Sequence, residues 1–175
     1  MEKLQKNSLV LTGFMGTGKS SAGRIIARML GARFIDIDHE IKNMEGLSID
    51  EIFSKHGEDY FRSLETSVIR RLSSEGPAVI ATGGGAVLKE ENMKSLRHNG
   101  VIICLTADPE IIYARVSGSK SRPLLNTGDP AVKIKDMLAS RAPFYSKADI
   151  IIDTSSMTPV ETAEEVIKKF KEFCS

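Results

Sequence analysis

Short apolar runs alternate along this chain with longer segments in which apolar residues recur at helical spacing. Runs at residues 8–12, 33–36, 78–81, 101–106 and 149–152 have the length of buried strands. The segments between them carry apolar residues three or four positions apart, as on one face of a helix. Strands that alternate with helices are typical of a parallel sheet covered on both faces. The pattern therefore predicts an α/β protein with five strands.

Helix ends and apolar faces can be placed in several of these segments. A helix after residue 18 should end at Gly31, and a capping box at Ser48 should start another. A longer helix is expected from about residue 58 to 75, and a last one follows a Thr-Pro cap. We expect the first helix to bury Ala22, Ile25, Ile26, Met29 and Leu30, and the last to bury Val160, Ala163, Ile167, Phe170 and Cys174.

The amino-acid composition mainly argues against certain classes of protein. The chain has 175 residues, 41% of them hydrophobic and 27% charged, with a net charge of +1. These values are ordinary for a soluble globular domain and give no sign of a nucleic-acid or membrane-surface partner. No signal peptide or membrane span is visible, and two cysteines, Cys104 and Cys174, make no disulfide framework. We expect one cytoplasmic, monomeric domain spanning 1–175.

Residues 13–20 read GFMGTGKS and match G-x-x-x-x-G-K-[ST], the P-loop pattern, without a mismatch. The glycines let backbone N–H groups surround phosphate oxygens. Lys19 can reach the β- and γ-phosphates, and the Ser20 hydroxyl can hold Mg²⁺. A glycine-rich turn that matches by chance is the alternative, which the flanking strand and helix disfavour. The motif therefore predicts a phosphate site at a helix N-terminus.

Asp36 and Asp38 follow the second predicted strand. Strand alternation would send both carboxylates to one side, at the edge that faces the nucleotide crevice. One carboxylate could serve Mg²⁺ through water, and the other could accept a proton or hydrogen bond from a hydroxyl substrate. The alternative is that both simply cap the next helix.

A run of glycines and three arginines complete the candidate site. Thr82-Gly83-Gly84-Gly85 follows the third strand, and three glycines allow a ligand to approach the backbone closely. Arg62 lies on a predicted helix, where carboxylates one turn away could fix it. Arg122 lies in the polar segment 117–128, which we interpret as a mobile lid, and Arg141 lies near a helix break. An isolated arginine is usually a surface residue, so the interpretation depends on all three together.

The assembled motifs resemble those of shikimate kinases. The matching pieces, in order, are GFMGTGKS at 13–20, DID at 36–38, GEDYFRSLE at 57–65, TGGG at 82–85, RPLL at 122–125 and RAPFY at 141–145. The resemblance implies a three-layer α/β sandwich of the P-loop NTPase type, with a five-stranded parallel sheet in the order 2-3-1-4-5. It also implies ATP-dependent phosphorylation of the 3-hydroxyl of shikimate, in chorismate and aromatic amino-acid biosynthesis, with Mg²⁺ as cofactor.

Carried over by position, the resemblance assigns residues to four roles. Those implied to be catalytic are Lys19, Asp38 and Arg122. Those implied to bind ATP are Gly16, Thr17, Gly18, Lys19, Ser20, Ser21, Arg115, Arg122 and Pro159. Those implied to bind shikimate are Asp38, Phe61, Arg62, Gly83, Gly84, Gly85 and Arg141. Mg²⁺ would be held by Ser20 and, through water, by Asp36.

The resemblance also implies a substrate-binding helical segment at about 38–75, in which Glu65 holds Arg62 in place, and a lid from which Arg122 closes over the γ-phosphate. One departure is visible. Met157 stands where some family members carry an arginine that stacks on the base. The adenine contact at this position is therefore an open question, although a methionine can still pack against the ring.

Four alternatives stay open at this point. The nearest is another small-molecule kinase of the same architecture, for gluconate or a nucleoside monophosphate. A GTP-dependent switch is suggested by Ser146-Lys147-Ala148-Asp149, one letter from N-K-x-D, but no D-x-x-G occurs. A dinucleotide-binding oxidoreductase would need a third glycine where Ser21 stands. A catalytically silent nucleotide-binding relative is disfavoured by the intact candidate residues.

Overall fold

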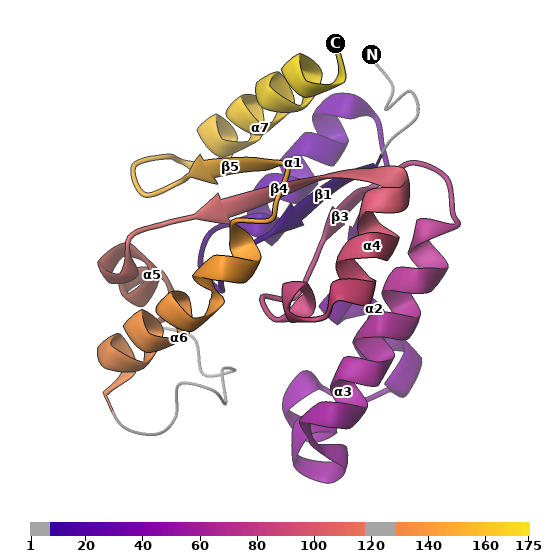
Figure 1. The fold of residues 1–175 in the computed structure, drawn as a ribbon, viewed down its shortest axis with the longest axis vertical. Coiled ribbons are helices and arrows are strands. Elements are labelled where there is room, and N and C mark those ends of the chain that lie inside the picture. The colour runs from indigo at the N-terminus through magenta and orange to yellow at the C-terminus, as the bar shows by residue number, and fades with distance from the viewer. Residues whose placement is uncertain (1–7, 118–128) are drawn as a thin grey trace.

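Five parallel strands form the centre of the molecule, in the order β2-β3-β1-β4-β5 (Figure 1). The computed structural model describes residues 8–117 and 129–175. The strands are β1 (Ser8–Thr12), β2 (Phe34–Asp36), β3 (Val79–Ala81), β4 (Gly100–Thr106) and β5 (Ile150–Asp153). The helices are α1 (Lys19–Leu30), α2 (Ile37–Glu45), α3 (Ile49–Ser73), α4 (Glu90–Asn99), α5 (Pro109–Val116), α6 (Pro130–Tyr145) and α7 (Pro159–Cys174), with a 3₁₀ turn η1 (Ala86–Leu88). The predicted α/β class, strand number and strand order are confirmed.

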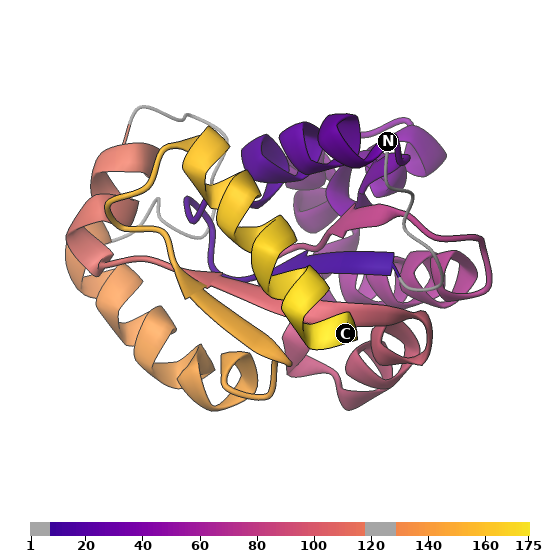
Figure 2. The same ribbon diagram turned by 90° about the horizontal axis from the view of Figure 1, so that it is seen from above.

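Helices cover both faces of this sheet, which makes three layers (Figures 1 and 2). Successive residues of a strand point to opposite faces, and here both faces are buried. Leu9 and Leu11 of β1 pack with α1 and α7, whereas Val10 packs in a second core with residues of α3, α4, α5 and α6. Cys104 of β4 is a fully buried member of that second core, as its apolar neighbours predict. The apolar runs of β1, β3 and β4 are therefore strands buried on both sides, whereas the edge strand β5 exposes Ile151.

The apolar faces of α1 and α7 differ in part from the expected ones. Met29 and Val160 are half exposed, and Cys174 at the end of α7 is exposed. The buried face of α1 is centred on Ile26, with Ala22 and Leu30 one turn to either side. At 100° per residue, Met29 lies about 60° from Ile26, on the side opposite to Gly23 and Ala27, which are also buried. Both helices therefore have the expected apolar face, but the expected faces included residues at their edges that are exposed.

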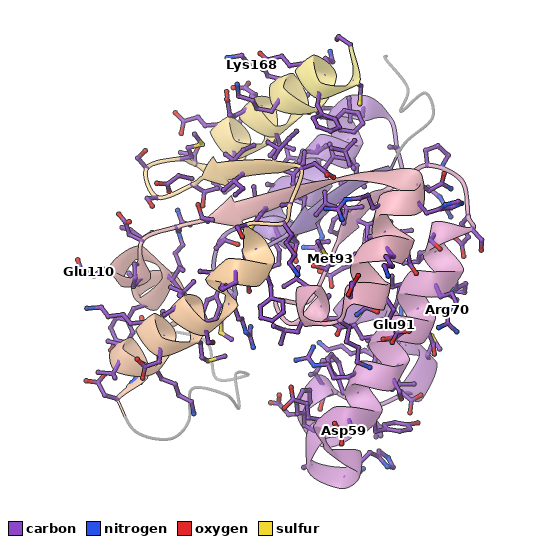
Figure 3. All side chains as sticks on the ribbon, in the orientation of Figure 1. Asp59, Arg70, Glu91, Met93, Glu110 and Lys168 are labelled. Carbon is purple, nitrogen blue, oxygen red and sulfur yellow. The ribbon has the colours of Figure 1, made fainter. Side chains whose placement is uncertain are left out.

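The two helices expected between residues 48 and 75 are present as the two halves of α3. The capping box at Ser48 starts the first half, and the second half ends at Ser73. Gly57, with φ 84° and ψ 172°, is not helical and separates the two halves. Arg70 of α3 and Glu91 of α4 lie side by side at 3.5 Å (Figure 3). Apart from Ser117, the expected lid at 117–128 lies outside the described residues.

Candidate functional site

The P-loop connects β1 to α1 and leaves the start of that helix open. Gly13 has φ +133°, and a side chain there would collide with the carbonyl of Leu105 in β4, so only glycine fits. Lys19 Nζ donates hydrogen bonds of 2.8 Å to the carbonyls of Gly13 and Phe14. Within the described residues, no side chain caps the N-terminus of α1 at Gly18. Its first N–H groups and the positive end of the helix dipole are therefore directed at an anion site.

A cavity of about 490 Å³ opens over this loop. Its lining includes every residue expected to bind ATP except Arg122, which lies outside the described residues; these are Gly16, Thr17, Gly18, Lys19, Ser20, Ser21, Arg115 and Pro159. Met157 also lines it, as do Thr154 and Thr162, which the sequence analysis missed. We call it the nucleotide cavity.

Arg115 and Thr154 form hydrogen bonds with carbonyl groups of the P-loop. Arg115 donates to the Gly16 carbonyl at 3.2 Å and to the Thr154 carbonyl at 2.9 Å. The Thr154 hydroxyl donates to the Thr17 carbonyl at 3.1 Å. Thr154 directly follows β5. Because ligands of open α/β sheets bind at the carboxyl ends of the strands, its position was the signal that could have identified it.

Two oxygen groups on the floor of the nucleotide cavity fit a magnesium site. The Ser20 hydroxyl donates to Asp36 Oδ2 at 2.6 Å, and both residues line the cavity. Among the described residues, no cluster of three or more His, Cys, Asp or Glu side chains is placed to hold a metal. Mg²⁺ does not need one, because it usually keeps several waters and takes one or two protein ligands beside substrate phosphates. The hydroxyl and carboxylate present are of the type that Mg²⁺ prefers.

Asp36 and Asp38 lie together, as expected. The expected reason, alternation of side chains along a strand, is wrong. β2 ends at Asp36, and α2 begins at Ile37, so Asp38 is in the first turn of a helix. Asp36 Oδ1 accepts the backbone N–H groups of Asp38 and His39, at 3.1 and 3.3 Å. Asp36 therefore caps α2 and contacts Ser20 at the same time. The capping alternative is correct for Asp36, and its role toward Mg²⁺ stays a prediction.

A second cavity of about 330 Å³ adjoins the first and contains both described arginines of the motif set. Every residue expected to bind shikimate lines it: Asp38, Phe61, Arg62, Gly83, Gly84, Gly85 and Arg141. The sequence analysis missed Met15, Lys42, Ser48, Ile49, Asp50 and Phe53, which complete the lining. We call it the acceptor cavity. Phe53 and Phe61 pack against each other across the Gly57 kink, with ring centroids 4.8 Å apart and planes tilted by 38°, which gives the cavity an apolar wall.

Arg62 is held by two carboxylates of its own helix. Its guanidinium lies 2.8 Å from Glu65, which is fully buried, and 3.1 Å from the more exposed Glu58. Burial raises the pKa of the Glu65 carboxyl, and the guanidinium of Arg62 opposes that rise. Arg141 is only 9% exposed and lies over the ring of Phe14, 5.5 Å from its centroid. Both guanidinium groups are thus fixed in place before any ligand binds.

Because residues 83–85 have no side chains, charged side chains of the protein can lie close to their backbone. A Cβ on Gly83 would lie 2.8 Å from Glu65 Oε1 and 3.0 Å from Asp38 Oδ1. A Cβ on Gly85 would lie 2.6 Å from Arg62 Nη1. The expected reason for three glycines was close approach of a ligand. The structure adds that the cavity's charged groups need the same space.

Asp38 occupies the junction between the two cavities and lines both of them. Its Oδ1 is buried and, among the described residues, accepts no hydrogen bond from protein. Burial, and next the charge of Asp36, raise the pKa of the Asp38 carboxyl, while Lys19, Arg62 and Lys42 oppose the rise. A carboxylate with a raised pKa and an unused oxygen is suited to accept a proton or a hydrogen bond from a hydroxyl.

The parallel sheet, the P-loop and the adjoining acceptor cavity define a P-loop phosphotransferase that acts on a small molecule. The model of the shikimate kinase family (SKI) matches residues 15–171. The chain belongs to the shikimate kinase family.

Known relatives agree over almost the full length. A shikimate kinase of Thermodesulfovibrio yellowstonii is 47% identical over 164 residues, 94% of this chain and 95% of that relative. One of Caldanaerobacter subterraneus is 50% identical over 163 residues, 93% and 95% of the two chains. The solved structure of an Acinetobacter baumannii shikimate kinase in complex with shikimate superposes with a TM-score of 0.92 at 36% identity, covering 96% of this chain and 94% of that one. The resemblance seen in the motifs is confirmed, and a GTP-dependent switch and an oxidoreductase are excluded.

Proposed function

We propose that this chain transfers the γ-phosphoryl group of ATP to the 3-hydroxyl of shikimate, giving shikimate 3-phosphate for chorismate and aromatic amino-acid biosynthesis. ATP occupies the nucleotide cavity, and shikimate occupies the acceptor cavity. The observation that carries the proposal is the position of Asp38, which lies between the P-loop and the two arginines and lines both cavities. A hydroxyl held beside Asp38 faces the terminal phosphate.

The acceptor cavity suits a small anionic triol. Arg62 and Arg141 bind its carboxylate, because a planar guanidinium matches a carboxylate better than a lysine ammonium does. The apolar wall at Phe61 contacts the ring, and the backbone of residues 83–85 lies against the hydroxyl groups. Asp38 orients the reacting hydroxyl and accepts its proton as the bond to phosphorus forms.

Phosphoryl transfer demands positioning and charge neutralisation more than covalent participation by the protein. Lys19 turns from the P-loop carbonyls to the β- and γ-phosphates. Arg122, which lies outside the described residues, remains the residue expected over the γ-phosphate. Arg115, Met157 and Pro159, which line the same cavity, flank the adenine. Ser20, and Asp36 through water, would hold Mg²⁺, which would supply positive charge to the phosphate oxygens.

The location and assembly of the protein stay predictions from the sequence. In the parts of the chain that the structure describes, no helix combines the length and apolar character of a membrane span. We expect a cytoplasmic monomer whose partners are its two substrates.

The test is ADP release from Mg·ATP, measured with shikimate and separately with gluconate and nucleoside monophosphates. Of these acceptors, we expect only shikimate to be phosphorylated. Arg62→Ala should raise KM for shikimate far more than KM for ATP. The matched control is Arg33→Ala, which removes an exposed arginine paired with Glu75 at 3.3 Å on the surface. Folded protein that binds Mg·ATP but shows no preference for shikimate would refute the proposal.

A further inference from the structure

Tyr145, the last residue of α6, contacts the glycine loop without lining either cavity. Its hydroxyl donates a hydrogen bond of 2.8 Å to the carbonyl oxygen of Gly84. The side chain is buried, with 6% of the residue exposed, and its ring belongs to the core under the sheet. The hydrogen bond therefore joins the end of α6 to the loop that follows β3.

Gly84 is the point at which the two cavities meet. It lines both of them. A Cβ built on Gly84 would lie 3.3 Å from the carbonyl oxygen of Gly13 and 3.4 Å from Nη1 of Arg141. The P-loop thus lies on one side of this residue and the Arg141 guanidinium on another. A rotation of the Gly84 peptide would change the surface of the acceptor cavity beside Arg141.

Arg141 precedes Tyr145 by one helical turn, so the two side chains lie on the same face of α6. Burial raises the pKa of the Tyr145 hydroxyl to about 12, and the neighbouring Arg141 guanidinium opposes that rise. The hydroxyl is therefore protonated at neutral pH and can act as a donor. The Tyr145 hydroxyl thus binds the Gly84 peptide and lies within the electrostatic influence of Arg141.

We propose that Tyr145 is a positioning residue for the acceptor, which fixes the Gly84 peptide and the Arg141 guanidinium in the arrangement that binds the acceptor's carboxylate. Without the hydroxyl, the Gly84 carbonyl loses its partner, and a glycine peptide without a side chain rotates readily. The inference rests on the proposed function, because it concerns the acceptor cavity.

The test is Tyr145→Phe, which removes the hydroxyl and keeps the ring in the core. We expect KM for shikimate to rise about fivefold, as for the loss of one net hydrogen bond of typical strength. KM for ATP and kcat should change by less than about twofold, since the nucleotide contacts of the P-loop remain. The matched control is Tyr113→Phe on α5, where the tyrosine is 41% exposed; both KM values should stay unchanged.

A double-mutant cycle with Arg141→Lys measures whether Tyr145 acts through the arginine. We expect the Tyr145→Phe effect on shikimate binding to shrink in the Arg141→Lys background. A variant with a lower melting temperature and unchanged KM for shikimate would overturn the inference, because the hydroxyl would then be purely structural. Tyr145→Met is the second variant, and failure of both to fold would overturn it as well. If the wild-type protein does not phosphorylate shikimate, the proposed function fails instead.

Discussion

Gly85→Ala is the sharpest test of how the acceptor cavity is built. Gly85 has φ −97° and ψ −2°, which alanine adopts without strain. The new methyl group would, however, lie 2.6 Å from Arg62 Nη1 and 2.7 Å from Arg62 Cζ. These distances are too short for contact between non-bonded atoms, so the guanidinium must move. The substitution therefore displaces the Arg62 side chain without changing its chemical structure.

The magnitude follows from what Arg62 loses. Its 2.8 Å ion pair joins it to Glu65, which is fully buried. Losing one charge-assisted hydrogen bond of this kind costs about 1.5–3 kcal/mol. The same movement takes the guanidinium away from the acceptor carboxylate, so we expect shikimate affinity to fall about 10- to 150-fold. ATP affinity should stay unchanged, and the melting temperature should fall by roughly 3–10 °C.

Isothermal titration with shikimate and with ATP measures both affinities directly, and a thermal melt reports stability. The control is Gly76→Ala, where an added Cβ meets no atom within 4 Å. The decisive measurement is the same Gly85→Ala change in an Arg62→Ala background, where its effect on shikimate affinity should vanish. Equal losses in both backgrounds would refute the reasoning, because the methyl group would then act on something other than Arg62.

Three further changes test the rest of the site. Asp38→Asn should lower kcat about 10²- to 10⁴-fold, the usual contribution of a general base. In the wild type, kcat/KM should fall as the pH drops through the raised pKa of Asp38, because the ionised form is the acceptor, and this acidic limb should disappear in the variant. Ser20→Ala should raise the Mg²⁺ concentration needed for half-maximal rate, measured at fixed ATP, and an unchanged requirement would remove Ser20 from the metal site. Lys42→Glu should raise KM for shikimate several-fold at low salt and less at high salt; a salt-independent effect would contradict an electrostatic role.

Most of the fold could be predicted because each strand is a continuous apolar run bounded by polar residues. The order of the strands came from the family resemblance, since local patterns do not encode which strands are neighbours. The break in α3 could be predicted, because Gly57 resembles a helix end in the sequence and is not helical in the structure. The direction in which the second half continues could not be predicted, because it depends on how the two halves pack.

The candidate site was predictable where a residue belonged to a local motif. Residues such as Lys42 and Asp50 reach the acceptor cavity because α2 and α3 fold over it, and nothing in their own neighbourhoods signals this. The hydroxyl of Tyr145 meets a carbonyl 61 residues away in the sequence. Contacts of this length depend on the topology of the sheet, which a motif search does not contain.

Gly83 and Gly84, which have no side chains, line both cavities where these meet. Little side-chain bulk from this loop therefore stands between the two binding positions. A chemist who wished to tether an adenosine phosphate to a shikimate analogue would need only a very short bridge, close to the size of the migrating group itself. Larger linkers would have to leave by the mouth of one cavity and lose the contacts at this junction.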